Sequence, residues 1–294
     1  MLQKIVIMIK EDILQEKVLY AGNSLLDELR AHGVGIAVTA DGDTYQNTQA
    51  THTDADAVSH DKTDEETLYI TDSESTYHVL RQQGKYVLPY RHEENQNEDF
   101  AGALYVIEQI EEIDYESVDM AYRRLAGLPW HILTTKRCMI RETVEEDVDS
   151  FYQIYAESEI TKYMEDLYAD RDEEIAYIRN YREKVYSFYG YGMWTILTKD
   201  GTVIGRAGIS WSEGFDLPEL GFVIGVPWQR QGYAYEVCSA ILTYAQGELG
   251  MTRIQALVMS GNDKSEALCR KLGFHYMDQI ALDGQMYTQM VCDL

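Results

Sequence analysis

The stretch that decides the fold is residues 219–234, which read Glu219-Leu220-Gly221-Phe222-Val223-Ile224-Gly225-Val226-Pro227-Trp228-Gln229-Arg230-Gln231-Gly232-Tyr233-Ala234. Its first half is an apolar run of the kind found in buried strands. Pro227 has no backbone N–H to donate, so the strand ends before it. A short loop follows, in which Gly232 either adopts a positive φ or lets a ligand approach the backbone closely. From residue 233 to 246 the apolar residues recur at helical spacing, which predicts a helix.

A strand, a glycine loop and a helix N-terminus in this order form a site for an anion such as a pyrophosphate. The free N–H groups of the first helical turn and the positive end of the helix dipole converge on one point. No Gly-Lys-Ser/Thr of a P-loop follows, and no Gly-x-Gly-x-x-Gly is present in this stretch. The stretch therefore predicts phosphate binding of another kind.

The loop resembles motif A of the GNAT (GCN5-related) N-acetyltransferases, Gln/Arg-x-x-Gly-x-Gly/Ala, because Gln229, Gly232 and Ala234 match it fully. Residues 262–274 are similar to the family's second signature, an Asn-capped helix that ends in Gly-Phe. Both signatures stand in the family's order and spacing. The resemblance covers residues 136–294, and segments 160–164 and 219–222 look most like its RimJ/RimL-like branch.

The element order from residue 136 onward also resembles that of the family. It reads strand, two helices, three strands, helix, strand, helix and two strands. The resemblance implies an α/β fold over residues 136–294, with a mixed central sheet and flanking helices. Residues 1–130 alternate strand-like and helix-like segments, which predicts a smaller α/β domain with a parallel sheet. The breakers at residues 127–130 mark the boundary.

The first domain resembles the later part of a haloacid-dehalogenase-like fold around residues 68–88. Asp54 and Asp56 match that family's nucleophile motif, but a polar segment precedes them instead of a buried strand. His52 and His60 nearby either bind a metal or belong to a solvated loop, and residues 41–67 have few apolar anchors. We therefore expect a degenerate, non-catalytic domain without a metal.

The composition excludes several function classes. The 294 residues carry 50 acidic and 25 basic side chains, a formal net charge of −25. Such a field repels nucleic acid and anionic membranes and favours cationic partners such as amines, although solubility alone also explains it. The four cysteines form no Cys-x-x-Cys pair, and neither a signal peptide nor a membrane span is recognisable. We predict a cytoplasmic monomer or homodimer.

The resemblance implies that acetyl passes from acetyl-CoA to a primary amine by direct attack in a ternary complex. The acceptor is a small molecule or the N-terminal amine of a peptide or protein. In the family, the strand before the loop diverges from its neighbour and pairs with the pantetheine amides. Arg230 either adds a charge-assisted contact or is a solvated cation. The residues implied to bind acetyl-CoA are Phe222, Val223, Ile224, Val226, Gln229, Arg230, Gln231, Gly232, Tyr233, Ala234, Asn262 and Ser265.

Two residues are candidates for catalysis. Glu219 matches the position of a family general base, and the alternatives are that it binds a cationic substrate or is a solvated strand end. Many GNAT enzymes carry a Tyr acid seven residues after the Asn, where this chain has Cys269. A thiol has a pKa of about 8.5, so the CoA thiolate can leave unprotonated. Cys269 either donates a proton or packs its helix.

The acceptor contacts implied by the resemblance lie beside the first two helices of the second domain. They are Tyr163, Met164, Trp194 and Trp211. A rival function is a non-catalytic acyl-CoA-binding regulatory protein. The missing Tyr and the degenerate first domain favour this rival, and acetyl transfer to a panel of amines separates the two.

Overall fold

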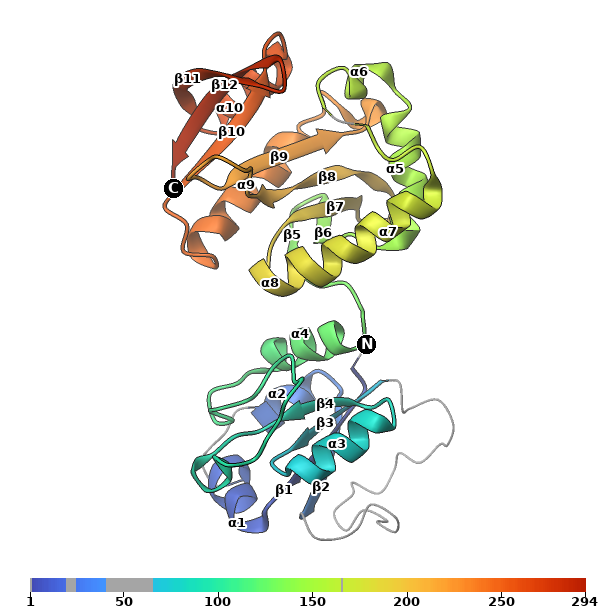
Figure 1. The fold of residues 1–294 in the computed structure, drawn as a ribbon, viewed down its shortest axis with the longest axis vertical. Coiled ribbons are helices and arrows are strands. Elements are labelled where there is room, and N and C mark those ends of the chain that lie inside the picture. The colour runs from blue at the N-terminus through green and yellow to red at the C-terminus, as the bar shows by residue number, and fades with distance from the viewer. Residues whose placement is uncertain (1, 20–24, 41–65, 165) are drawn as a thin grey trace. The chain divides into compact units, whose positions relative to one another are not determined.

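The computed structural model describes residues 2–19, 25–40, 66–164 and 166–294, in two compact units, Met1–Leu128 and Pro129–Leu294 (Figure 1). Asp54, Asp56, His52 and His60 lie outside the described residues, so the predictions for them stay predictions. In the described part of the chain, no helix is both long enough and apolar enough to cross a membrane.

The first unit is built on a four-stranded sheet of order β2-β1-β3-β4 in which every described pair is parallel. The predicted small α/β domain with a parallel sheet is therefore confirmed. The strands are β1 (Lys4–Ile9), β2 (Gly35–Ala40), β3 (Thr67–Thr71) and β4 (Tyr86–Pro89). The helices are α1 (Glu11–Ile13), α2 (Leu25–Ala31), α3 (Glu74–Gln82) and α4 (Tyr115–Leu125), with a π-helix at Leu14–Leu19 and a 3-10 turn at Glu93–Asn95.

Both faces of this sheet are covered, which explains the continuous apolar sequence of its strands. On one face of the sheet, Ile5, Ile7 and Ile9 of β1 share a buried cluster with residues of α1, α2 and α4. Val6 and Met8 face α3. Residues 4–9 thus form a strand that is buried on both faces. Residues 98–114 form turns and one isolated bridge, Tyr90↔Ile107, directly after β4, and the next helix begins at Tyr115 of α4.

The second unit contains an eight-stranded sheet of order β11-β12-β10-β9-β8-β7-β6-β5. Only the β9–β10 pair is parallel among the described pairings. The predicted mixed sheet is confirmed, with one unexpected strand at the β5 edge. Its strands are β5 (His131–Thr134), β6 (Cys138–Glu142), β7 (Met193–Thr198), β8 (Val203–Ser210), β9 (Glu219–Ile224), β10 (Arg253–Met259), β11 (His275–Leu282) and β12 (Gln285–Asp293).

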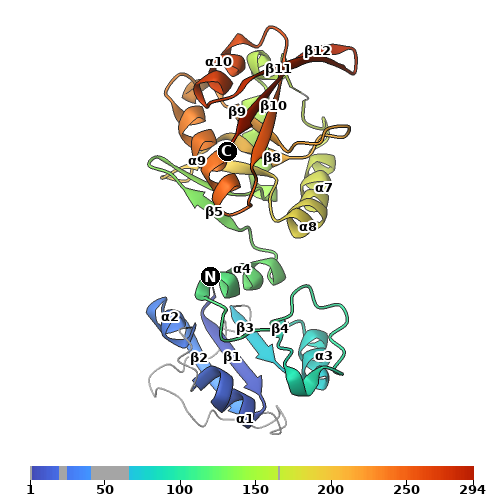
Figure 2. The same cartoon turned by 90° about the vertical axis from the view of Figure 1, so that its left-hand side faces the viewer.

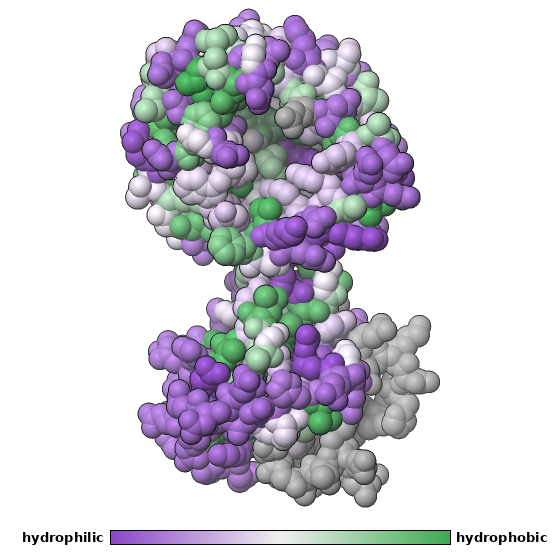
Figure 3. Space-filling view, in the orientation of Figure 1, coloured by the Kyte–Doolittle hydropathy of each residue, from purple (hydrophilic) through white to green (hydrophobic). Residues whose placement is uncertain are grey.

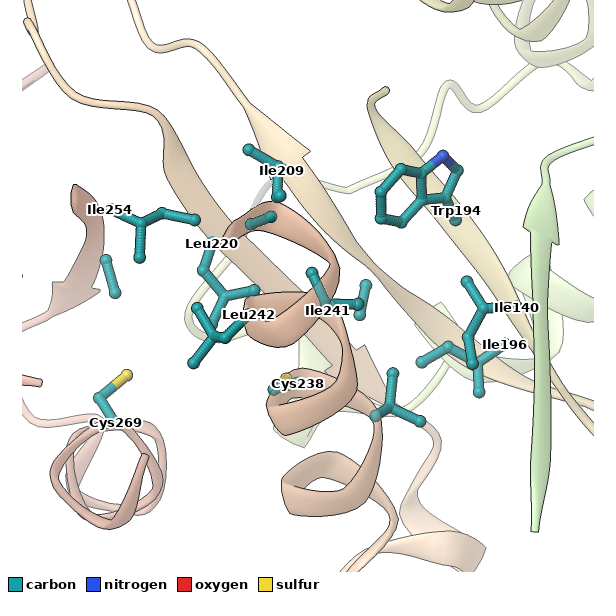
Figure 4. Close-up of a cluster of buried hydrophobic side chains, with 14 of the residues drawn as sticks. Ile140, Trp194, Ile196, Ile209, Leu220, Cys238, Ile241, Leu242, Ile254 and Cys269 are labelled. Atoms are coloured by element: carbon teal, nitrogen blue, oxygen red, sulfur yellow. The ribbon is translucent and has the colours of Figure 1, made fainter. Parts of the chain in front are cut away.

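Helices flank this sheet on both sides (Figure 2). α5 (Val148–Tyr155), α6 (Ser158–Thr161), α7 (Arg171–Tyr181) and α8 (Ser187–Tyr189) precede β7, with a π-helix at Arg182–Tyr186. α9 (Tyr233–Gly247) and α10 (Asp263–Lys271) lie on the other side. Val237, Cys238 and Ile241 of α9 are fully buried against the sheet and anchor the main core (Figure 4). This core holds β9 and the N-terminus of α9 in fixed relation.

Candidate functional site

The strands β9 and β10 begin side by side and then separate. Their described register contains one pair, Gln255↔Glu219, beside which the Gln255 N–H donates to the Pro218 carbonyl at 2.8 Å. On its other edge β9 stays paired with β8, where the Gly225 N–H donates to the Ile204 carbonyl at 2.9 Å. Because antiparallel pairing alternates, the Phe222 and Ile224 N–H groups point to the side from which β10 has diverged. This opening offers backbone donors to a ligand.

The loop after β9 is braced by its own glutamine side chains. Gln229 Nε2 donates to the Ile224 carbonyl at 2.9 Å, and Gln231 Nε2 donates to the Pro227 carbonyl at 2.7 Å. Arg230 and Gly232 have positive φ angles, 59° and 83°. Both glutamine side chains are therefore used within the loop, so the donors it offers to an anion are backbone N–H groups and the exposed Arg230 side chain.

The first turn of α9 supplies further donors. The Gly232 carbonyl accepts the Glu236 N–H at 3.0 Å. The N–H groups of Tyr233, Ala234 and Tyr235 precede this bond, so no helical carbonyl is available to them. A left-handed Gly232 directly before a helix N-terminus fits a pyrophosphate both in shape and in the sign of the dipole.

Arg137, which the sequence did not single out, holds the loop from the side. Its Nη1 donates to the Gln231 carbonyl at 3.0 Å, its Nε donates to Glu236 at 2.7 Å, and its guanidinium lies 4.1 Å from the Tyr233 ring centre. Burial alone would raise the pKa of Glu236, but hydrogen bonds from Thr135 and Arg137 hold that pKa below its ordinary value. Arg137 and Gln231 are 94 positions apart, so no local pattern could reveal the contact.

The second signature follows β10, the strand that diverges from β9. Asn262 is the N-cap of α10, and its side chain accepts the Ser265 N–H at 3.2 Å. The Tyr163 hydroxyl donates to the Gly261 carbonyl at 2.8 Å, so the segment after α6 meets the turn between β10 and α10. Met164 packs against the buried cluster that includes Phe151 and Val223. Tyr163 is thus held next to the Asn-capped start of α10.

Glu219 lies where β9 and β10 start to diverge. It accepts hydrogen bonds from the Ser212 hydroxyl and from the Leu257 backbone N–H. Burial raises the pKa of Glu219 above its ordinary value despite these two bonds. A carboxylate with such a pKa is a better proton acceptor than a solvated one. The geometry therefore places a fixed, partly desolvated carboxyl group at the point where β9 and β10 diverge.

The rim next to Glu219 is aromatic. Trp211 precedes Ser212 in sequence, is 46% exposed, and donates from Nε1 to the Tyr191 hydroxyl at 2.5 Å. Met193 Sδ lies 3.0 Å from the point where a Cβ on Gly221 would sit, so the glycine leaves room for this side chain. The space-filling view shows that the surface of the second unit is hollowed on the side that faces the viewer (Figure 3).

Two residues predicted for the site lie elsewhere. Trp194 is fully buried in the main core and meets Tyr244 of α9 at 5.8 Å between ring centres (Figure 4). Trp194 pairs with Ala207 of β8, and Ala207 pairs with Phe222 of β9, so these three side chains lie on one face of the sheet. Glu219 is three residues before Phe222 along β9, so its side chain lies on the other face. Trp194 therefore faces the side of the sheet opposite to Glu219, and this placement corrects its expected role as a substrate contact.

Cys269 is also fully buried in the main core (Figure 4). Burial, together with the nearby charge of Glu266, raises the pKa of its thiol to about 12. A thiol this reluctant to ionise is a poor proton donor to a departing thiolate, whose conjugate acid has a pKa of about 8.5. The structure therefore favours packing over the acid role for Cys269.

Replacing Cys269 with Ala should keep kcat within about twofold, because no reacting group depends on the thiol. The smaller side chain should lower the free energy of unfolding by about 1–2 kcal/mol through the cavity it leaves. Steady-state kinetics and urea unfolding measure the two effects. Cys138→Ala, equally buried on β6, is the matched control, and a selective loss of kcat at Cys269 alone would restore the acid role.

Comparison with known families and proteins adds an independent observation. Residues 137–275 match the family "Acetyltransferase (GNAT) domain". An uncharacterized N-acetyltransferase, YoaA of Bacillus subtilis, is 28% identical over 150 residues, which covers 49% of this chain and 82% of the relative. The [ribosomal protein uS5]-alanine N-acetyltransferase of Escherichia coli is 28% identical over 176 residues, 54% of this chain and 88% of the relative.

Among solved structures, a putative GnaT-family acetyltransferase from Bordetella pertussis aligns with a TM-score of 0.46 at 24% identity, over 55% of this chain and 99% of that one. In the part of the chain that the structure describes, no three His, Cys, Asp or Glu side chains gather as a metal site. The family match falls on the diverging strands, the glycine loop and the Asn-capped helix. Residues 137–275 are therefore a GNAT acetyltransferase domain, and the chain that carries them is an N-acetyltransferase.

Proposed function

We propose that the second unit transfers acetyl from acetyl-CoA to a primary amine, and that Glu219 accepts the proton of that amine. The observation that carries this proposal is the position of Glu219 at the point where β9 and β10 diverge. A base at this point lies beside backbone donors suited to an amide-containing ligand, so both reactants would meet at one opening.

The residues present fit acetyl-CoA, which supplies the reactive thioester when bound. The Phe222 and Ile224 N–H groups would pair with pantetheine amides on the open edge of β9. The backbone of residues 229–234 would hold the pyrophosphate, with Val223 and Val226 lining the apolar side. Arg137 would position this loop, and the exposed Arg230 would add a charge beside it. Asn262 and Ser265 would contact the cofactor from the start of α10.

The proton path begins at Glu219. A free amine has a pKa of about 10, so it reaches the site mostly as an ammonium ion and must lose a proton before attack. The Ser212 hydroxyl and the Leu257 N–H fix the carboxylate, and burial makes it more basic. General-base assistance of this kind contributes about 10²–10⁴-fold to the rate.

The acceptor enters past Tyr163, Met164 and Trp211. A cationic acceptor suits the net charge of −25. The Escherichia coli relative is named for acetylating the alanine of a ribosomal protein, which favours a peptide N-terminus beside small amines. The rival non-catalytic function loses its main support, because a thiolate can leave without the missing Tyr. All four cysteines are free, which suits a reducing cytoplasm.

A panel of amines tests this function. We expect thiol release from acetyl-CoA to depend on at least one member of a panel of polyamines, amino acids, aminoglycosides and peptides with free N-termini. N-terminally blocked versions of the active peptides, or N-methylated versions of active amines, provide matched controls. Tight acetyl-CoA binding without amine-dependent thiol release across the panel would favour the regulatory protein instead.

A further inference from the structure

The first unit has its own ligand-binding edge by topology. The chain passes from β1 to β2 on one side, and then to β3 on the other side of β1. In open parallel sheets, ligands bind at such a switch point, outside the carboxyl ends of the strands. Here those ends are followed by Lys10 after β1, Asp72 after β3 and Tyr90 after β4. The π-helix Leu14–Leu19 lies close in sequence to this edge, and π-helical turns are frequent at functional sites.

Asp72 is held rigidly at this edge. Its side chain is 0% exposed, and its Oδ2 accepts the Lys10 N–H and a bond from His92 Nε2, both at 3.1 Å. His92 Nδ1 accepts the Glu94 N–H at 3.3 Å, which leaves Nε2 as the ring nitrogen that donates to Asp72. Asn95 Nδ2 donates to the Asp72 and Tyr90 carbonyls, each at 2.8 Å. Both hydrogen bonds that orient the carboxylate of Asp72 are thus accepted by Oδ2.

The second oxygen of this carboxylate has no donor. Asp72 Oδ1 is buried without a hydrogen-bond partner in the structure, and a buried unpartnered acceptor on a charged group is costly. Both partners of this carboxylate, the Lys10 backbone N–H and the His92 ring, donate to Oδ2. A donor that also carries positive charge would satisfy Oδ1 and stabilise the buried carboxylate.

The surroundings are acidic and aromatic. Tyr90 is 1% exposed, and its ring lies 5.2 Å from that of His92 between centres. Burial raises the pKa of Tyr90 to about 12, with further contributions from Glu111, Asp72 and Glu16. Lys17 Nζ lies 3.7 Å from Glu111 Oε1 and 3.9 Å from Glu16 Oε1. Lys10 Nζ lies 3.6 Å from Glu94 Oε2. The nearby lysines are therefore already directed to other carboxylates.

We propose that the carboxyl edge of the first sheet binds a primary alkylammonium ion, with its N–H groups directed to Asp72 Oδ1 and its alkyl part beside Tyr90. The described residues there do not form a set of three metal ligands, which argues for an organic cation over a divalent metal. A quaternary ammonium has the charge but no N–H to donate to Oδ1. The site is independent of Glu219 and of the acetyl-transfer reaction.

The test uses the full chain and n-butylammonium chloride as the probe, at constant ionic strength. Calorimetry on the wild type should detect a binding event that Asp72→Asn weakens about 10- to 100-fold, the effect of losing a charge-assisted bond. Asp27→Asn removes an equal charge from an exposed position of the same unit and should leave binding unchanged. Glu219→Gln should also leave this event in place, which separates it from amine binding at the acceptor site.

A second measurement does not depend on the folding of a variant. In wild-type protein labelled with ¹⁵N-histidine, the His92 Nε2–H signal, assigned through His92→Gln, should shift on addition of n-butylammonium. Tetramethylammonium should leave it in place. An unmoved His92 signal with n-butylammonium, unchanged affinity in a folded Asp72→Asn protein, or an equal response to magnesium chloride would each overturn the proposal.

Discussion

Replacing Glu219 with Gln should lower kcat by about 10²–10⁴-fold, the usual contribution of a general base. Gln keeps the size of the side chain and can still accept from Ser212, but it cannot take a proton from the amine. Acetyl-CoA affinity should stay nearly unchanged, because the phosphate-binding loop is formed by other residues. Steady-state kinetics with the best amine of the panel and calorimetry with acetyl-CoA measure both quantities.

The pH profile adds a second readout for Glu219. Burial raises its pKa, so the base form should appear at a higher pH than for an ordinary Glu. Wild-type kcat should rise with pH through this limb where chemistry limits the rate, and the Gln variant should lack the limb. Glu213→Gln, an exposed carboxylate in the preceding turn, is the matched control and should retain it. A loss confined to KM would instead assign Glu219 to binding a cationic substrate.

Replacing Gly232 with Val should weaken acetyl-CoA binding by about 10- to 100-fold, the equivalent of the 1–3 kcal/mol that a strained left-handed residue costs. Gly232 has φ +83°, which a β-branched residue rarely adopts. The variant loop would relax away from the left-handed turn and would have to regain it on binding. A Cβ here would lie 3.5 Å from Arg137 Nη2, an ordinary contact, so backbone strain dominates.

Gly250→Val separates this effect from general destabilisation. Gly250 has φ +63° beyond the end of α9, and a Cβ there would meet no atom within 4 Å. Both variants should lose stability by similar amounts, but only Gly232→Val should lose acetyl-CoA affinity by calorimetry. Equal affinity in the two variants would remove the loop from the proposed cofactor site.

The fold of the second unit was predictable because its signals are local. The apolar run at residues 220–226, the breaker Pro227 and the Asn262 cap each act within a few residues of themselves. Strand β5 was missed, since its four residues are only partly buried or exposed and carry no continuous apolar pattern. In the first unit, residues 98–114 have helix-forming composition, yet the Ile107 bridge to Tyr90 fixes them in an extended and turning path.

The parts of the site that are formed by the backbone could be predicted from the sequence, whereas those formed by side chains from distant segments could not. A glycine loop before a helix indicates an anion site from sequence alone, whereas Arg137 reaches it by a contact over 94 positions. The predicted role of Trp194 was wrong because the face on which a strand residue lies depends on the register of the sheet. The sequence around Trp194 does not determine that register. Burial in the assembled fold raises the pKa of Glu219 against the lowering effect of the hydrogen bonds from Ser212 and Leu257, so this shift could not be predicted from the local sequence.

The most direct test of the acetyl-transfer proposal follows the acetyl group itself. Wild-type protein is mixed with acetyl-CoA carrying a deuterated acetyl group and with the most active amine, and the products are analysed by mass spectrometry during a single turnover. We predict that the label appears on the amine nitrogen as CoA is released, with none on the protein at any time. Label on the protein before the amine, or CoA release without labelled amine, would contradict direct transfer.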